Sequence, residues 1–143
     1  MSTHQIHVFI SHSWNYSEHY EKLAEWIFQQ PWEANGSSLV FIDYSVPRDD
    51  PIHFARNSEQ LLHAISQKIT QSHVVVIPTG MYAQYSTWIK KEINSANNLV
   101  KPILAVNPWG QQRSSSVVTN AATRSVGWNS ERIVSGIWEL YCK

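Results

Sequence analysis

Hydrophobic residues along the chain fall into short apolar runs that are separated by segments with helical spacing. Apolar runs rich in β-branched residues predict strands at 6–11, 38–43, 73–78 and 101–106, with a brief fifth strand at 125–128. The intervening segments predict four helices: one carrying Tyr20, Leu23, Ala24, Ile27 and Phe28, one carrying Leu61, Leu62, Ile65 and Ile69, one over 86–96 carrying Ile89, Ile93 and Ala96, and one carrying Ile133, Val134, Ile137, Trp138 and Tyr141.

Capping and turn residues mark the ends of these helices and the connections between them. Asn15 and Glu18 have the spacing of a capping box, and Asn129 or Ser130 is expected to cap the last helix, as Asn57 or Ser58 caps the second. We expect a plain connection at 30–37, a long irregular loop at 44–56 and a further loop at 107–123.

The order of these elements predicts one α/β domain over residues 1–143. Continuous apolar strands that alternate with helices indicate a parallel sheet with helices on both faces. Five strands favour a flavodoxin-like three-layer sandwich with strand order 2-1-3-4-5. Its ligand crevice lies at the carboxyl ends of the first and third strands. The loop after residue 11 and the helix over 86–96 should meet there.

Composition excludes several classes of partner. Lysine plus arginine and aspartate plus glutamate both number 11, so no basic field indicates nucleic acid or an anionic membrane. The single cysteine, Cys142, cannot form an internal disulfide, and no apolar run reaches the length of a membrane span or signal segment, so we expect a cytoplasmic protein. The seven histidines lack metal-ligand spacing, so we expect no metal site.

Glu92 has an unusual position for a charged residue. It lies four residues after Trp88, in the row beside the apolar stripe of its helix. One interpretation is a solvated carboxylate near Lys90 and Lys91; the other is a functional carboxylate at the crevice.

The residues expected at the crevice exclude several classes of ligand. The segment after the first strand has no glycine, which argues against flavin and P-loop phosphate binding, and the strands lack the acidic residues of a phospho-receiver. The remaining candidates offer aromatic rings, hydroxyls and carboxylates: Ser11, His12, Ser13, Trp14, Asp43, Tyr44, Ser45, Trp88 and Glu92. This set suits a nucleotide or ribosyl ligand, although Trp88 could equally be core, Asp43 a turn cap and His12 a structural loop residue.

The motifs HVFISHSW, FIDYSVPRDDP and STWIKKEI resemble those of the TIR (Toll/interleukin-1 receptor homology) domain, over about residues 6–106. These sequence motifs are most similar to those of the bacterial TIR-like branch that includes the sensor protein of Thoeris anti-phage systems. The loop sequence SVPRDDPI lacks the RDxxPG order of receptor-type TIR domains, which argues against a receptor adaptor.

The resemblance implies an enzyme that consumes NAD+ as substrate, needs no further cofactor and uses Glu92 as its catalytic carboxylate. It implies that the other eight candidate residues contact the substrate. It also implies homo-oligomerisation on activation and a downstream effector reached through the product nucleotide.

Two alternatives remain open. One is a non-catalytic TIR scaffold that joins protein partners. The other is an enzyme of the nucleoside deoxyribosyltransferase type, which pairs the same fold with an active carboxylate and exchanges nucleobases without using NAD+.

Overall fold

A computed structural model describes residues 3–11, 19–34, 36–44, 58–79, 82–107 and 116–142. The elements in chain order are β1 (Thr3–Ile10), α1 (His19–Phe28), β2 (Trp32–Ala34), β3 (Ser37–Asp43), α2 (Ser58–Thr70), β4 (Val74–Pro78), α3 (Tyr82–Asn98), β5 (Ile103–Asn107), α4 (Ser116–Ala121), β6 (Arg124–Gly127) and α5 (Ser130–Cys142). The capping box predicted at Asn15 and Glu18 lies outside the described residues.

The sheet has six strands in the order β2-β3-β1-β4-β5-β6. Five of the strands are parallel to one another, namely β3, β1, β4, β5 and β6. The remaining strand, β2, pairs antiparallel with β3. The α/β class is therefore confirmed, but a five-stranded, all-parallel sheet was the wrong prediction in strand number and in uniform direction. The parallel strands place the ends of β1 and β4 side by side.

β2 is the strand that the sequence pattern missed, because residues 30–37 were expected to be a plain connection. It forms a hairpin with β3, and Gly36 makes the turn with a φ of 80° that favours glycine. Trp32 holds β2 in place by donating its indole N–H to the carbonyl oxygen of Trp26 at 2.7 Å. A side-chain contact from another element thus stabilises a strand of only three residues.

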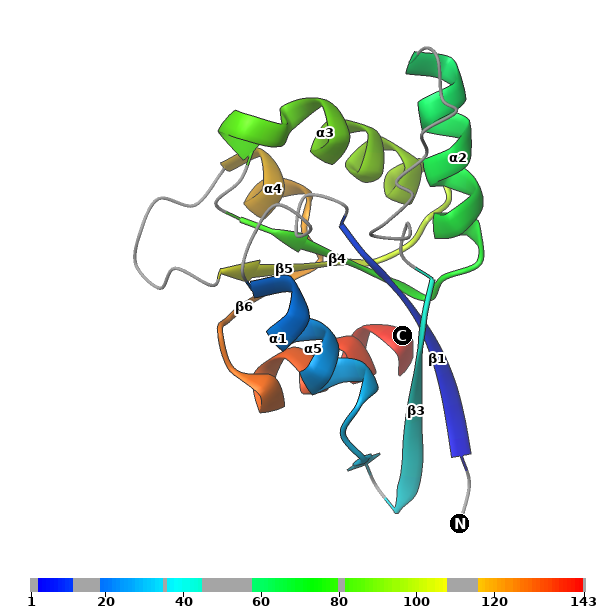
Figure 1. The fold of residues 1–143 in the computed structure, drawn as a ribbon, viewed down its shortest axis with the longest axis vertical. Helices are drawn as coiled ribbons and strands as arrows, with labels where there is room; N and C mark the ends of the chain where they lie inside the picture. The colour runs from blue at the N-terminus through cyan, green and yellow to red at the C-terminus, as the bar shows by residue number, and fades with distance from the viewer. Residues whose placement is uncertain are drawn as a thin grey trace.

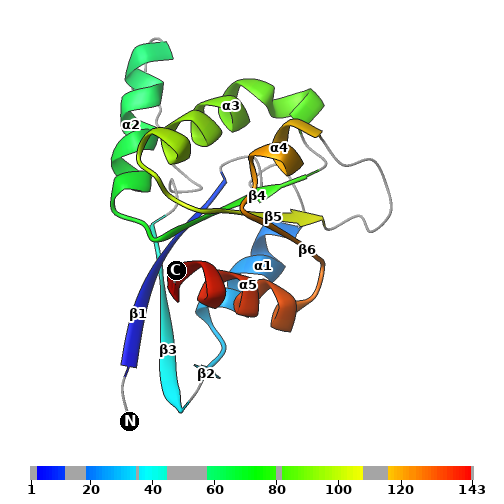
Figure 2. The same ribbon diagram turned by 180° about the vertical axis from the view of Figure 1, so that it is seen from behind.

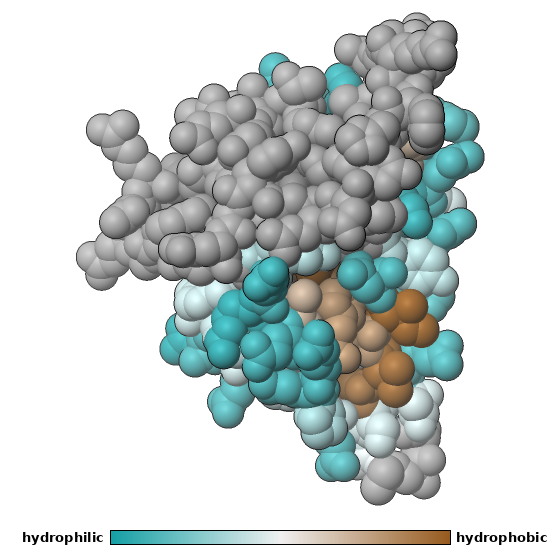
Figure 3. All heavy atoms as spheres, in the orientation of Figure 1, coloured by the Kyte–Doolittle hydropathy of each residue, from teal (hydrophilic) through white to brown (hydrophobic). Residues whose placement is uncertain are grey.

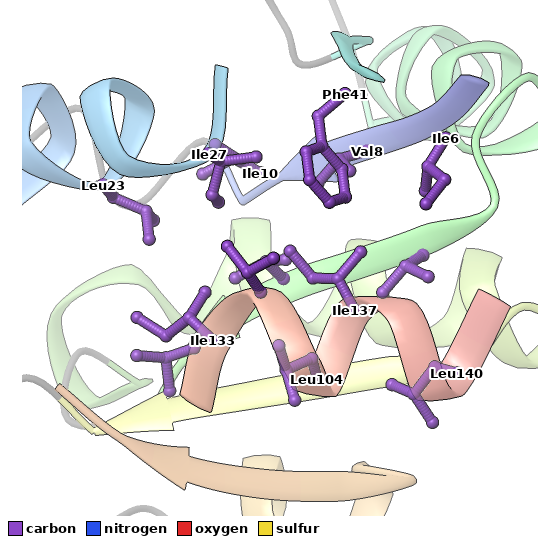
Figure 4. Packing of buried hydrophobic residues seen from close by; sticks show 14 of the residues in the cluster. Ile6, Val8, Ile10, Leu23, Ile27, Phe41, Leu104, Ile133, Ile137 and Leu140 are labelled. Carbon is purple, nitrogen blue, oxygen red and sulfur yellow. The ribbon is translucent and has the colours of Figure 1, made fainter. Parts of the chain in front are cut away.

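The sheet separates two layers of helices, with α1 and α5 on one face and α2, α3 and α4 on the other (Figures 1 and 2). The core between the sheet and α1 and α5 is mainly aliphatic (Figure 4). α5 lies close to the sheet at Gly136, where a Cβ would be 2.9 Å from the Leu104 Cδ1 atom. The second core contains Phe9 of β1 and Ile89 of α3.

α4 is the second element that the sequence pattern missed. The segment 107–123 was expected to be a loop, but residues 116–121 form a short helix. Val118 is fully buried in the core beneath it, whereas Val117 is exposed. One buried apolar side chain in six residues gives no helical periodicity, so the pattern could not predict this helix.

Candidate functional site

Alternation of side chains along β1 directs Ser11 toward α3. Ile6, Val8 and Ile10 face the core beneath α1 and α5, whereas Phe9 faces the core beneath α2 and α3. The Ser11 N–H continues the pairing by donating to the Val76 carbonyl oxygen at 2.8 Å. Ser11 therefore keeps the extended register and points to the same face as Phe9.

α3 brings Glu92 to the same place. Ile89, Ile93 and Ala96 are buried along one stripe of the helix, and Glu92 is buried beside them. The Ser11 Oγ atom donates a hydrogen bond of 2.5 Å to the Glu92 Oε1 atom. The structure thus joins the end of the first parallel strand to the helix that follows the third, at the crevice expected of this topology.

Burial excludes one of the two interpretations of Glu92. Its exposed fraction is 0%, as is that of Ser11, so the interpretation as a solvated surface carboxylate is wrong. Removing a carboxylate from water is costly unless hydrogen bonds replace its hydration. A bond as short as 2.5 Å is typical of a hydroxyl that donates to a charged oxygen, which makes Ser11 a strong partner.

Asp43 and Tyr44 lie at the carboxyl end of β3. Asp43 is exposed, and the Tyr44 N–H donates to the Val8 carbonyl oxygen at 2.9 Å. The Tyr44 ring packs against the ring of His7, with their centroids 4.4 Å apart. Since His7 precedes Ser11 by four residues, the Tyr44 contact lies about 13 Å along β1 from the Ser11–Glu92 pair. The substrate-binding roles of both residues stay predictions.

The other candidates cannot be placed. His12, Ser13, Trp14 and Ser45 lie outside the described residues. The backbone of Trp88 belongs to α3, one turn before Glu92, but its side chain is outside the described set. The roles predicted for these five residues stay predictions.

His7 and His73 form an imidazole pair near the amino end of β4. The His73 Nδ1 atom accepts a hydrogen bond of 2.9 Å from the His7 N–H, and the two rings are 4.8 Å apart. The His7 Nδ1 atom lies 3.0 Å from the Gln71 carbonyl oxygen. Burial, followed by the charges of His7 and Lys101, lowers the pKa of His73 below its usual 6.5. The fold therefore favours a neutral His73, whose Nδ1 atom is free of a proton.

Thr79 is a buried polar residue that the sequence analysis did not select. It follows β4 directly, 3% of its surface is exposed, and its Oγ1 atom has no hydrogen-bond partner within the described part of the chain. It lines a cavity of about 650 Å³ at the carboxyl ends of β5 and β6, bounded by the first turns of α5. Its place at the end of a parallel strand, where ligands of such sheets bind, was the available signal.

A second cavity, of about 500 Å³, lies between the end of α1 and β3. Its lining includes Phe28, Val40 and Phe41, and Figure 3 shows hydrophobic surface in this region beside the hydrophilic surface of α1. The lining is mixed, because Gln29, Gln30, Glu33 and Ser38 belong to it as well.

The described ranges contain neither a metal-binding cluster nor a helix that could span a membrane. Histidine, cysteine, aspartate and glutamate side chains there form no group of three that could hold a metal ion. Helices in those ranges are too short or too polar to cross a bilayer.

Comparisons with known proteins gave one informative match. No curated protein matches the chain. Among solved structures, the apo form of translation elongation factor SelB from Methanococcus maripaludis is similar with a TM-score of 0.47 and 10% sequence identity, over 96% of this chain and 35% of that chain. The family model described as "Thoeris protein ThsB, TIR-like domain" matches residues 9–113, which include both Ser11 and Glu92. The chain therefore belongs to the TIR-like domain family of Thoeris ThsB proteins.

Proposed function

We propose that this chain cleaves the bond between nicotinamide and ribose in NAD+ and so makes an ADP-ribose-derived signal in bacterial anti-phage defence. The main support for this proposal is the buried hydrogen bond between the Ser11 hydroxyl and the Glu92 carboxylate at the crevice of the sheet. Family membership supports the role in defence, since Thoeris is an anti-phage system.

A single carboxylate is enough for this reaction. Breaking the N-glycosidic bond passes through a transition state with oxocarbenium character, and a nearby carboxylate stabilises its positive charge. A glycosidase needs a second acid to protonate its leaving group, but nicotinamide leaves from a pyridinium and departs neutral without a proton. Glu92 therefore supplies the one charge that the step needs.

Ser11 orients that charge. Its hydroxyl occupies one carboxylate oxygen of Glu92, Oε1, and fixes the rotation of the side chain. A carboxylate held in this way loses little freedom when the transition state forms, which is the benefit of preorganisation.

Access to Glu92 requires a change in structure. Because 0% of its surface is exposed, a substrate can touch the carboxylate only after the atoms that cover it move. We therefore propose that the isolated chain rests in a closed state and that self-association or another trigger opens the crevice. The product, whether ADP-ribose, a cyclic isomer or a conjugate, depends on which nucleophile reaches the ribosyl cation.

Nicotinamide release tests the proposal. Purified protein is incubated with NAD+ over a range of protein concentrations, and released nicotinamide and the product mass are measured. We expect release to rise more than linearly with protein concentration, and Glu92→Gln to abolish it. The matched control is Glu33→Gln at an exposed position of β2, which should keep full activity. Equal rates for the wild type and Glu92→Gln would contradict the proposal.

A non-catalytic scaffold is the second candidate, and complete burial of Glu92 favours it, because such a carboxylate could serve only to hold α3 against β1. In that case Glu92→Gln should preserve phage defence in cells, since an amide keeps the shape and can still accept from Ser11. The alternative of a deoxyribosyltransferase predicts that the protein exchanges the nucleobases of nucleosides without using NAD+. Chromatography of the nucleosides would detect this exchange.

A further inference from the structure

The cavity beneath Thr79 has the size and place of a second ligand site. Its volume of about 650 Å³ falls within the range of small-molecule pockets. It opens at the carboxyl ends of β5 and β6, where Asn107 and Gly127 end the two strands. The strand order places it one to three strands from Ser11, or about 5 to 15 Å away. It therefore shares the ligand-binding edge of the sheet without including Glu92.

Thr79 brings an unused hydrogen-bonding group to this cavity. Its N–H is used, because it donates to the Val106 carbonyl oxygen at 3.0 Å, and this bond fixes the backbone. Its hydroxyl oxygen is buried and has no hydrogen-bond partner among the described residues, and the residue lines the cavity. Buried hydroxyls in proteins are nearly always paired, so this one is a candidate partner for a polar group of a ligand.

The remaining polar groups indicate what kind of molecule would pair with it. Hydroxyls of Thr119, Ser125 and Ser135 line the cavity together with the Asn107 amide. Short side chains that both donate and accept are suited to the hydroxyl groups of a sugar.

The charged groups at one end suit a phosphate. The cavity is bounded by the amino end of α5, where the helix dipole favours anions. The Arg132 side chain lines it and has no acidic partner among the described residues, whereas Arg124 is paired with Glu139. Arg132 is thus available to bind a phosphate, and the Glu131 carboxylate at the same end can accept from sugar hydroxyls.

We propose that this cavity binds the phosphorylated ribose of a nucleotide, with the Thr79 hydroxyl paired to the sugar and Arg132 to the phosphate. Two sources share this chemistry. One is a separate nucleotide that regulates the protein. The other is the adenylate half of the dinucleotide whose nicotinamide ribose reaches Glu92, and this second source alone depends on the function proposed above.

Binding of AMP to the full chain tests the site without any need for catalysis. We expect a saturable NMR titration in which amide shifts cluster at the ends of β5 and β6 and at the start of α5. Thr79→Val and Arg132→Gln should each weaken binding at least tenfold, while Thr70→Val, a matched change on the exposed face of α2, should leave it unchanged. Without ligand, Thr79→Val should melt no lower than the wild type, because it removes an unpaired hydroxyl.

The proposed site would be contradicted if AMP binding were not saturable or if both cavity variants bound AMP as tightly as the wild type. A lower melting temperature for ligand-free Thr79→Val would also contradict it. Equal affinity for inorganic phosphate would indicate an adventitious anion only.

A competition experiment then distinguishes the two sources of the nucleotide. AMP that competes with NAD+ in nicotinamide release occupies the adenylate subsite, whereas AMP that binds without competing is a separate regulator. If no nicotinamide is released, the function proposed above fails while the binding result stands.

Discussion

Ser11 and Glu92 form one unit, because each satisfies the other at a place where neither contacts solvent. Removing the hydroxyl would take away the donor to the Glu92 Oε1 atom. Hydrogen bonds to charged groups contribute about 1.5–3 kcal/mol, which corresponds to roughly 10- to 100-fold in rate if the bond acts in the transition state.

We therefore predict that Ser11→Ala lowers kcat for nicotinamide release by about 10- to 100-fold. Since the serine acts only through Glu92, the double variant Ser11→Ala with Glu92→Gln should be no slower than Glu92→Gln alone, as expected for groups that act as a unit. Steady-state kinetics of the four proteins measures this. Independent, multiplicative losses would show that Ser11 has a separate role.

His73 gives the protein a predicted sensitivity to acid. Its pKa is lowered in the folded state, by burial first and then by His7 and Lys101. Above the ordinary histidine pKa of 6.5 the residue is neutral in both states, and the fold keeps its full stability. As the pH falls below that value the unfolded chain binds the proton more readily, so the free energy of unfolding decreases.

The check is urea unfolding between pH 7.5 and pH 5. His73→Asn keeps an acceptor near the His7 N–H but does not titrate, so we expect its free energy of unfolding to fall less than that of the wild type as the pH decreases. His63→Asn, at an exposed position of α2, is the control, and its free energy of unfolding should fall as much as that of the wild type. A steeper decrease in His73→Asn would contradict the assignment.

At the scale of single elements, α3 ends in a strained turn. The Lys101 N–H donates to the Ala96 carbonyl oxygen and the Val100 N–H to that of Asn97, which is the Schellman pattern. Val100 occupies the left-handed position with a φ of 56°, although its branched side chain is 88% exposed. This conformation costs an L-residue about 1–2 kcal/mol.

Val100→Gly should therefore raise the free energy of unfolding by about 1 kcal/mol, after the loss of backbone entropy is subtracted. Thermal unfolding measures the change. Val100→Ala separates strain from hydrophobic exposure, because it keeps the Cβ atom and should change stability little. A gain as large in Val100→Ala would show that exposure of the valine was the cause.

The start of α5 depends on a cap. The Asn129 Oδ1 atom accepts a hydrogen bond of 3.0 Å from the Arg132 N–H, so the predicted cap at this helix is confirmed for Asn129. Asn129→Ala should lower the free energy of unfolding by about 1 kcal/mol. The exposed Asn94 in the middle of α3 provides the control, since Asn94→Ala should be neutral or slightly stabilising in the same chemical denaturation series.

For the whole molecule, the hydrophobic pattern was sufficient for the parts that the core dictates. β4 and β5 are buried runs, β1 and β3 are apolar segments that supply core residues, and α3 and α5 carry clear apolar stripes, so their residues identify them without tertiary information. β2 and α4 are short and depend on contacts from distant residues, such as the bond from Trp32 to Trp26. No local pattern encodes such contacts.

The candidate site could be predicted to a similar extent. Strand order alone indicates that the end of β1 meets α3, and the structure brings Ser11 and Glu92 together there. The hydrogen bond itself and the complete burial of Glu92 depend on packing between residues 81 positions apart, so the sequence left solvated and functional interpretations both open. Thr79 was missed because only the structure shows that its hydroxyl is unpaired.

The central claim is that the charge of Glu92 drives cleavage of NAD+. The most direct measurement is the single-turnover rate of nicotinamide release by Glu92→Gln and by the wild type under the same activating conditions, with matched thermal unfolding curves to show that both are folded. We predict a loss of at least 100-fold, about 2.7 kcal/mol of transition-state stabilisation. A folded Glu92→Gln protein that releases nicotinamide at the wild-type rate would contradict it.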